Sequence, residues 1–362
     1  MFGWLSDSKG RRLAFWLAFA VMSVFSSLSF ITPIYWILAV CRLITGIGVG
    51  GFGTIYFVIS IEFCGSKLRP YASPILSSTF AIGGVIGAII AWATHDWRLY
   101  LIIVSAINFT MLIAIKFVAE SPHWLLSNGQ VAAASKIMQW VVYFSKSDVP
   151  QSFVDEVVAT SVTMQTGKSE HVSFKALLNR QYLTRLMLLC FIWFTTSGVY
   201  YGLSFNSTEL SGNVYLNAAL SSAIEIPAYV VAGYITERLG RKISVLITMA
   251  TAGIGCIILA SLLQAGVTTY AALMGSALLA KAGIAAEYAI IYTFTAELFP
   301  TKIRTLAIGV CSQAARIAGL AFPYLFLSAH PTIPPFIFGG TALLSAIVAF
   351  GLKETKNTVL TQ

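Results

Sequence analysis

The chain has 362 residues, of which 57% are hydrophobic and 10% are charged, with a formal net charge of +9 and a mean hydropathy of +0.80. Soluble domains carry about 25% charged residues, because a surface that faces water needs them. The composition excludes a soluble, a disordered and a nucleic-acid-binding protein. It predicts an all-helical membrane protein, since about 206 hydrophobic residues suffice for up to about ten spans of about 20 residues each.

Apolar runs of about 18 residues or more recur along the chain and predict ten membrane-spanning helices. In chain order they are Leu13–Ile31, Tyr35–Ile61, Tyr71–Trp92, Leu99–Val118, Leu183–Leu203, Val214–Tyr234, Ile243–Leu263, Tyr270–Phe294, Ile303–Leu327 and Ile333–Leu352. Short polar joints separate these spans, except for one long polar stretch, Glu120–Tyr182. Within that stretch, Val131–Phe144 is predicted to form an amphipathic helix.

The basic residues are distributed unevenly between the two sides of the predicted membrane. Of the 23 Lys and Arg residues, 19 fall in alternate joints, and the other joints hold only Arg98. Cytosolic joints are rich in Lys and Arg, so both termini are predicted to be cytosolic. The net charge therefore indicates topology, and no nucleic-acid partner is expected. All five cysteines lie in spans or at a cytosolic edge, so no disulfide framework is expected.

An internal repeat relates two stretches of the sequence. Gly3–Arg12 and Gly233–Lys242 both read G-x3-acid-x2-G-R-[RK], 230 residues apart. Glu62–Arg69 and Glu297–Arg304 both read E-x4-K-x-R, 235 residues apart. Repeats in the same order at nearly the same offset predict two parallel halves, as in transporters whose halves are related by an axis along the membrane normal.

A third pair, Glu120 and Glu354, ends the two halves 234 residues apart. The predicted organisation is an N-terminal half at 1–119, a cytosolic loop at 120–181 and a C-terminal half at 182–362. In the second half two spans precede the repeated loop, whereas none precedes it in the first half. The sequence is therefore interpreted as ten helices of a twelve-helix plan, lacking the first two.

Charged residues on these cytosolic loops suit ion pairs that hold one conformation of a rocking protein and release it in the other. The alternative is that the basic residues only fix the topology. The candidate gating residues are Gly3, Asp7, Gly10, Arg11, Arg12, Arg42, Glu62, Arg69, Glu120, Glu237, Arg238, Gly240, Arg241, Lys242, Glu297 and Arg304.

Five charged residues fall well inside the predicted spans, away from their ends: Arg42, Glu225, Lys281, Glu287 and Arg316. A charge inside a bilayer is costly, so each is a functional hypothesis. The guanidinium of Arg316 suits a bidentate carboxylate, and Glu225 suits an ammonium group or a membrane base. The alternative is that Glu225, Lys281 and Arg316 pair only with one another. The role of Glu287 is left open.

Gly48–Gly53 matches the dinucleotide-binding pattern G-x-G-x-x-G, but that motif needs a strand and a soluble βαβ unit. Here the run lies in a predicted span, where glycines let helices approach closely. We therefore expect no bound nucleotide. The sequence contains no P-loop, HExxH or nucleophile elbow, so neither an enzyme nor an ATP-driven pump is expected. No metal site and no cofactor are expected, and a coupling ion is left unidentified.

The motifs resemble those of the major facilitator superfamily. They are the two repeated loops, the glycine run Gly46–Gly51 after Arg42, Glu120–Trp124 and Ala296–Arg304. The stretch 193–229 is similar to the organic cation/anion/carnitine transporters, and it lacks the paired glutamines of sugar porters, which share the Glu-Ser-Pro stretch. The family's first helix, its Cys-rich glycosylated outer loop and nearly all of its second helix are missing.

The resemblance implies a helical bundle that moves small organic ions by alternating access in the plasma membrane, with the substrate and lipid as partners. Cation-selective relatives usually have Asp where this chain has Arg316, so zwitterions or anions are favoured, and Tyr229 resembles the carnitine-type branch. The alternatives are a truncated, non-transporting protein or gene fragment, and a sugar porter. The expected substrate-binding residues are Arg316, Glu225, Trp193, Tyr200, Phe52, Lys281, Tyr201 and Tyr292.

Overall fold

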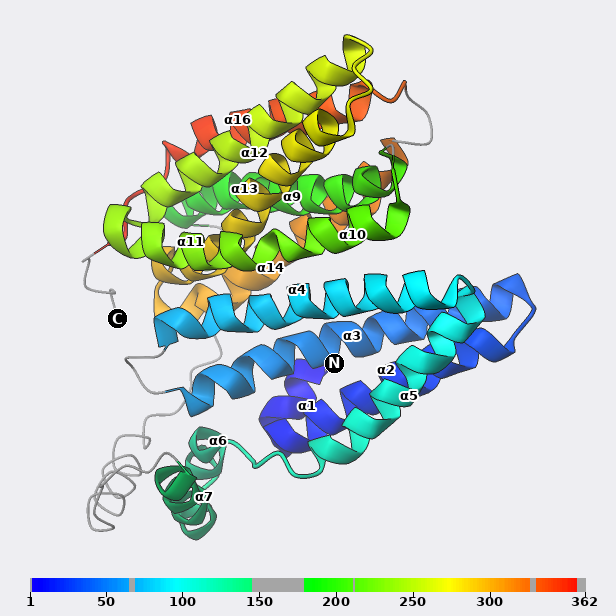
Figure 1. Ribbon diagram of the computed structural model, residues 1–362. Coiled ribbons are helices and arrows are strands. Elements are labelled where there is room, and N and C mark those ends of the chain that lie inside the picture. Colours follow the sequence, from blue (N-terminus) through cyan, green and yellow to red (C-terminus); the bar gives the residue numbers. More distant parts are fainter. Residues whose placement is uncertain (1, 65–68, 145–178, 211, 326–329, 357–362) are drawn as a thin grey trace. The chain divides into compact units, whose positions relative to one another are not determined.

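The computed structural model describes residues 2–64, 69–144, 179–210, 212–325 and 330–356 (Figure 1). Within these ranges every regular element is a helix, as the composition predicts. The helices are α1 (Phe2–Lys9), α2 (Arg11–Ile31), α3 (Tyr35–Phe63), α4 (Arg69–Thr94), α5 (Trp97–Ile115), α6 (Pro122–Ser127), α7 (Val131–Phe144), α9 (Arg180–Glu209), α10 (Val214–Ala223), α11 (Glu225–Leu239), α12 (Arg241–Gln264), α13 (Tyr270–Leu298), α14 (Thr301–Ala321), the short 3-10 helix η2 (Phe322–Tyr324) and α16 (Ile333–Ala349).

Nine stretches in the described part of the chain are long and apolar enough to cross a membrane. They correspond to the first nine predicted spans. The tenth prediction, Ile333–Leu352, is a shorter helix, because α16 has 17 residues and lies at the lower limit for a spanning helix. The amphipathic helix predicted at 131–144 is confirmed with the same bounds.

The sixth predicted span is interrupted between α10 and α11. Pro227 has no backbone N–H and cannot bond to the carbonyl four residues earlier, which belongs to Ala223, the last residue of α10. The chain resumes as a helix at Glu225. The interruption therefore places a carboxylate at the first residue of α11, inside a predicted span.

By its contacts the chain divides into two compact units, residues 1–72 with 93–170, and residues 73–92 with 171–362. Residues 73–92 of α4, which the sequence assigns to the first half, thus pack with the second unit; the boundaries of the halves stay a prediction. In the first unit α2 packs closely on α3, and a Cβ on Gly48 would lie 2.7 Å from the backbone N of Met22. Gly48 and Gly51 of the glycine run therefore serve close packing, whereas Gly46, Gly50 and Gly53 have open space around their Cβ positions.

The core of the second unit is formed by α9, α12, α13, α14 and α16. Its largest fully buried side chains include Trp193, Phe294 and Phe338. A Cβ on Gly283 would lie 2.5 Å from the backbone N of Ala252, so α12 and α13 approach at backbone distance. Small residues at a helix interface of a membrane protein allow this approach.

Most residues of the two repeated loops belong to helices, and the turns between these helices are single glycines. Residues 2–9 form α1, and Gly10, with φ +105°, is the one residue between α1 and α2. In the second unit α11 ends at Leu239, and Gly240 has φ +92° before α12 begins. In each motif the acidic residue thus lies in a helix, and the second glycine alone makes the turn.

Candidate functional site

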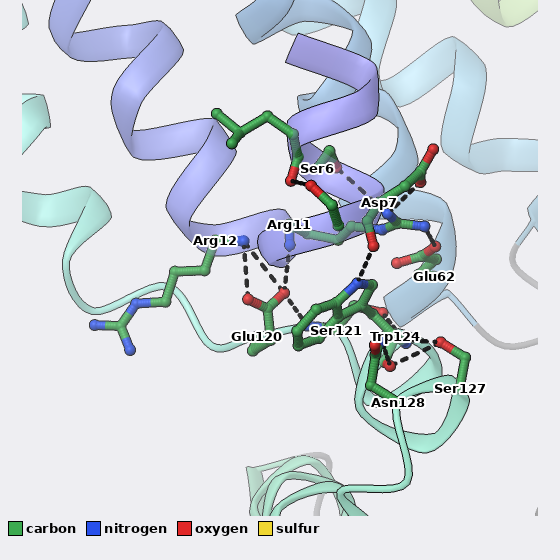
Figure 2. Close-up of polar contacts among 12 residues, drawn as sticks. Ser6, Asp7, Arg11, Arg12, Glu62, Glu120, Ser121, Trp124, Ser127 and Asn128 are labelled. Carbon is green, nitrogen blue, oxygen red and sulfur yellow. Dashed lines mark hydrogen bonds and ion pairs between the residues drawn. The ribbon is translucent and has the colours of Figure 1, made fainter. Parts of the chain in front are cut away.

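In the first unit, a carboxylate from a distant part of the chain caps α2 (Figure 2). Glu120 Oε1 accepts hydrogen bonds from the backbone N–H of Arg11 at 2.8 Å and of Arg12 at 3.2 Å, and Oε2 accepts from Arg12 at 3.2 Å. The first N–H groups of a helix lack partners within it, and Gly10 offers no side-chain cap. The carboxylate also lies at the positive end of the helix dipole.

The second unit contains the same arrangement at its equivalent positions. Glu354 Oε1 accepts from the backbone N–H of Arg241 at 2.9 Å, and Oε2 accepts from Lys242 at 3.1 Å. Burial acts to raise the pKa of Glu354, but hydrogen bonds from the backbone N–H groups of Lys356, Arg241, Thr355 and Lys242 outweigh it and lower this pKa below its ordinary value. Glu354 is therefore held as the carboxylate that α12 requires.

The turn glycine is required at both sites for two reasons. Gly10 and Gly240 have positive φ values, which L side chains rarely adopt. A Cβ on Gly240 would lie 2.7 Å from Glu354 Oε2, and one on Gly10 would overlap the carboxylate of Glu120. A side chain at either position would displace the capping carboxylate.

The two arginines that follow these glycines form equivalent ion pairs. Arg11 pairs with Asp7 and, at 3.4 Å, with Glu62 (Figure 2). Arg241 binds Glu297 with two nitrogens, since Nε lies 3.0 Å from Oε2 and Nη2 lies 3.0 Å from Oε1. Planar pairing of this kind is stronger and more directional than a single contact.

The next basic residue in each motif bonds to the end of a later helix. Arg12 donates to the carbonyl of Lys116, and Lys242 donates to the carbonyl of Phe350 at 2.8 Å. These carbonyls are separated by the same 234 positions as Glu120 and Glu354. The glutamate caps, the pairs of Arg11 with Glu62 and of Arg241 with Glu297, and these carbonyl contacts therefore recur at the paired positions of the internal repeat.

The remaining gating candidates make fewer defined contacts. Arg238 lies over the ring of Tyr234, 5.5 Å from its centroid, and Glu237 is exposed one residue earlier. Arg304 Nε and Nη2 are buried and have no hydrogen-bond partner among the described residues. Arg42 is exposed on α3 and Gly3 lies in α1, while the side chain of Arg69 is outside the described part of the structure.

The second unit contains a buried charged cluster formed by α9, α11 and α13. Lys281 Nζ lies 3.1 Å from Glu225 Oε1, and the two side chains are 4% and 3% exposed. Tyr200 and Tyr229 each donate a hydrogen bond of 2.8 Å to the Glu225 carboxylate. Lys281 also contacts Ser204 Oγ at 2.6 Å and lies 3.4 Å from the centroid of the Tyr200 ring. The cluster thus carries no net charge and satisfies its own polar groups.

A chain of aromatic rings runs from this cluster to Trp193. Tyr200 packs against Tyr201 and Tyr288 at 5.4 Å and 5.3 Å, and Tyr288 lies 6.4 Å from Tyr292. Tyr292 packs edge-on against Trp193 at 4.4 Å, and Trp193 donates a hydrogen bond to Thr295.

Sequence reasoning did not single out Tyr288. Its spacing could have indicated it, because Lys281, Tyr288 and Tyr292 follow one another at seven and four residues, which places them on one face of α13. Tyr229 was noted as a marker of one family branch and not as a ligand of Glu225.

Arg316 is exposed on α14. Among the described residues no carboxylate lies within ion-pair distance of it. Of the three charges that could have paired with one another, Glu225 and Lys281 do so and Arg316 does not.

Two other candidates lie apart from this group. Glu287 is fully buried on α13 and faces α12, where Thr248 Oγ1 donates to its Oε2 at 2.6 Å; its Oε1 has no hydrogen-bond partner among the described residues. Phe52, in the first unit, packs against Phe15 at 4.9 Å and Tyr56 at 5.9 Å. Within the described ranges no group of three His, Cys, Asp or Glu side chains could hold a metal ion.

Comparison with known proteins identifies the family. The sugar (and other) transporter model matches residues 1–362. The organic cation transporter protein of Drosophila melanogaster is 31% identical over 365 residues, which cover 99% of this chain and 66% of the relative. Solute carrier family 22 member 16 of Bos taurus is 30% identical over 372 residues, which cover 100% of this chain and 64% of the relative. The chain therefore spans slightly less than two thirds of the length of these relatives.

Solved structures show the same fold. The xylose transporter XylE from E. coli, in a partially occluded inward-open conformation, superposes with a TM-score of 0.77 at 20% identity, covering 99% of this chain and 84% of the transporter. A helical bundle, the family model and the named relatives agree with the motifs in the sequence. The chain belongs to the major facilitator superfamily, in the family of the organic cation, anion and carnitine transporters.

Proposed function

We propose that this chain acts in a secondary transporter that moves small organic zwitterions or anions, of the carnitine type, across the plasma membrane by alternating access. Family membership and the nine apolar stretches of spanning length among the described residues support membrane transport. The substrate class is supported by one observation in particular: the guanidinium of Arg316 is exposed on an apolar helix and has no carboxylate partner among the described residues.

Arg316 lies within the apolar stretch Leu306–Tyr324, where an isolated charge is costly. A protein keeps such a charge where a counter-ion compensates it, and no carboxylate of the described residues does so. A substrate carboxylate can supply both the counter-charge and two parallel hydrogen-bond acceptors for the planar guanidinium. Tyr288 and Tyr292 of the aromatic chain on α13 offer further polar groups in the same unit.

The buried cluster argues against a simple organic cation as the substrate. Glu225 is the acidic residue that could attract a cation, but its charge is neutralised by Lys281 and its oxygens accept from two tyrosines. Because Glu225 and Lys281 neutralise each other, the net charge of Glu225, Lys281 and Arg316 together is the +1 of Arg316. For a zwitterion, the faces of Tyr288 and Tyr292 can hold the ammonium group through cation–π contacts.

The repeated networks support a role in gating, as part of the same proposal. In each network the first residue of a helix, Arg11 or Arg241, pairs with an acidic side chain of another helix. The ion pairs of Arg11 are partly exposed. Ion pairs of this kind can break and re-form when helices shift, which suits an alternating-access cycle. The excess of Lys and Arg in alternate joints supports cytosolic termini.

The test is uptake by cells that express this chain, compared with Arg316→Asp and Arg316→Lys. Three labelled probes are needed: a quaternary-ammonium carboxylate, a monocarboxylate and a tetraalkylammonium ion. We expect uptake of the first two to fall by about 10- to 100-fold in Arg316→Asp, since a hydrogen bond to a charged group contributes about 1.5–3 kcal/mol. Arg316→Lys should lose less, because it keeps the charge and loses the bidentate geometry. Surface labelling controls for expression.

The results also separate the alternatives. Carboxylate uptake that is unchanged in Arg316→Asp would refute the substrate assignment. Absence of uptake of all three probes by a chain that reaches the surface would favour a non-transporting membrane protein. A neutral hexose is added as a fourth probe, and its uptake would favour a sugar porter.

A further inference from the structure

Two free cysteines of the second unit face each other between α9 and α14. Cys190 Sγ lies 3.8 Å from Cys311 Sγ, and neither thiol is in a disulfide. Each cysteine is ten residues from the first residue of its helix, so the two lie at the same depth along neighbouring helices. Cys311 is buried and Cys190 is half-buried, so a reagent reaches the pair through Cys190.

The packing further along the same interface holds these helices together. A Cβ on Gly198 of α9 would lie 2.6 Å from the ring of Phe322, which follows α14 directly. A Cβ on Gly319 of α14 would lie 2.9 Å from the ring of Tyr201 and 3.1 Å from Ser197 Oγ. Close contacts on two glycines fix the spacing of the helices, and with it the distance between the two sulfurs.

The sulfur–sulfur distance selects the kind of ligand that can bridge the thiols. Two bonds of about 2.3 Å, the length of a zinc–thiolate bond, span about 4.6 Å when they are collinear. At 3.8 Å the same bonds enclose an angle of about 111°. The pair therefore suits a pyramidal or tetrahedral centre better than a linear two-coordinate metal ion.

We propose that Cys190 and Cys311 form a two-thiol site for a trivalent organoarsenical, or for another thiophilic centre whose two bonds to sulfur are not collinear. A tetrahedral metal ion would need two further ligands, and the described residues offer no third His, Cys, Asp or Glu in the group. A trivalent arsenic that already carries one organic group needs two thiolates and no more. Soft thiolates are the protein ligands that suit such centres.

The reaction balances without an oxidant. An organoarsenic(III) oxide reacts with both thiols to form two arsenic–sulfur bonds, its oxygen leaves as water with the two thiol protons, and arsenic keeps its oxidation state. The product links α9 to α14. Trp193 follows Cys190 by three residues, and Arg316 follows Cys311 by five. The link therefore joins the two helices that carry these candidate substrate-binding residues. This consequence for uptake rests on the proposed transport function.

The binding test uses the purified full chain, phenylarsine oxide and intact-mass measurement. We expect one phenylarsenic group per chain, gained with loss of one water, that resists excess monothiol and is removed by a dithiol. Cys190→Ser and Cys311→Ser should each abolish the monothiol-resistant adduct, whereas Cys256→Ser, a buried lone thiol of the same unit, should keep it. Cys311→Ala is a second variant in case a hydroxyl at this buried position impairs folding.

An adduct retained by both folded single variants, or no adduct on the natural chain, would overturn the proposal. Because binding is read as mass, its outcome does not depend on transport. If uptake is present, phenylarsine oxide should abolish it in the natural chain and spare it in Cys190→Ser. If uptake is absent while the adduct forms, the proposed transport function fails and the two-thiol site stands.

Discussion

Replacing Lys281 with methionine tests the neutral buried cluster directly. The change removes the ammonium group and keeps an apolar stem, so Glu225 is left charged at 2% exposure with only two tyrosine hydroxyls to stabilise it. At 3.1 Å and an effective dielectric constant of about 20, the lost attraction is about 5 kcal/mol. Breaking a buried pair typically costs about 3–5 kcal/mol, so we expect that loss in unfolding free energy.

The measurement is a double-mutant cycle. Lys281→Met, Glu225→Gln and the double variant are unfolded in detergent micelles by titration with SDS and followed by tryptophan fluorescence, with Lys353→Met as an exposed control expected within about 0.5 kcal/mol. The double variant has no unpaired charge, so it should be more stable than Lys281→Met, with a coupling of at least about 1.5 kcal/mol. Unrelated sites deviate from additivity by only about 0.3–0.5 kcal/mol. Additive single variants would refute a neutral, mutually compensated cluster.

Three further predictions concern the capping carboxylate, the turn glycine and the buried acid. The folded-state pKa of Glu354 lies below its ordinary value, so its contribution to stability is complete above that ordinary value and is lost as the pH falls through the folded value. The free energy of unfolding, measured between about pH 6 and pH 3, should therefore depend less on pH in Glu354→Gln than in the natural chain. Equal slopes of this free energy against pH in the two proteins would contradict the capping role. Gly240→Ala should destabilise the protein by more than about 1 kcal/mol, because alanine is strained at this φ and its Cβ meets the Glu354 carboxylate. The control is Gly275→Ala, in open space on α13, which should be neutral or stabilising by up to about 1 kcal/mol. Thermal unfolding of both variants compares them, and equal effects would contradict the steric argument. Glu287→Gln should leave the free energy of unfolding within about 1 kcal/mol of the natural chain, since the neutral amide still accepts from Thr248. Glu287→Ala should cost about 2 kcal/mol or more by leaving a cavity, and similar losses in both variants would indicate that Glu287 is charged.

The sequence could predict the features that repeat. The offsets of about 230–235 residues identified Glu120 with Glu354 and Arg11 with Arg241 before any contact was known, because the same local chemistry is needed at two equivalent helix starts. Hydropathy predicted the spans, since the bilayer dictates their length and apolar character.

The partners of the intramembrane charges could not be predicted. Glu225, Lys281 and Arg316 allowed several pairings, and the choice depends on how α11, α13 and α14 are rotated about their axes. That rotation is set by packing, including the backbone approach at Gly283, which hydropathy does not encode. For the same reason Glu287 faces α12, whereas Lys281, six residues earlier on the same helix, faces α9.

The capping carboxylates also set an order of assembly during synthesis. Glu120 is made 109 residues after Arg11, and Glu354 is made 113 residues after Arg241. Until those carboxylates emerge, the first N–H groups of α2 and α12 lack their partners, although the helices themselves are complete. The starts of α2 and α12 can therefore be capped only after Glu120 and Glu354 have been translated. A nascent chain that stops a few residues before Glu354 would keep every helix of the second unit and still leave the start of α12 open.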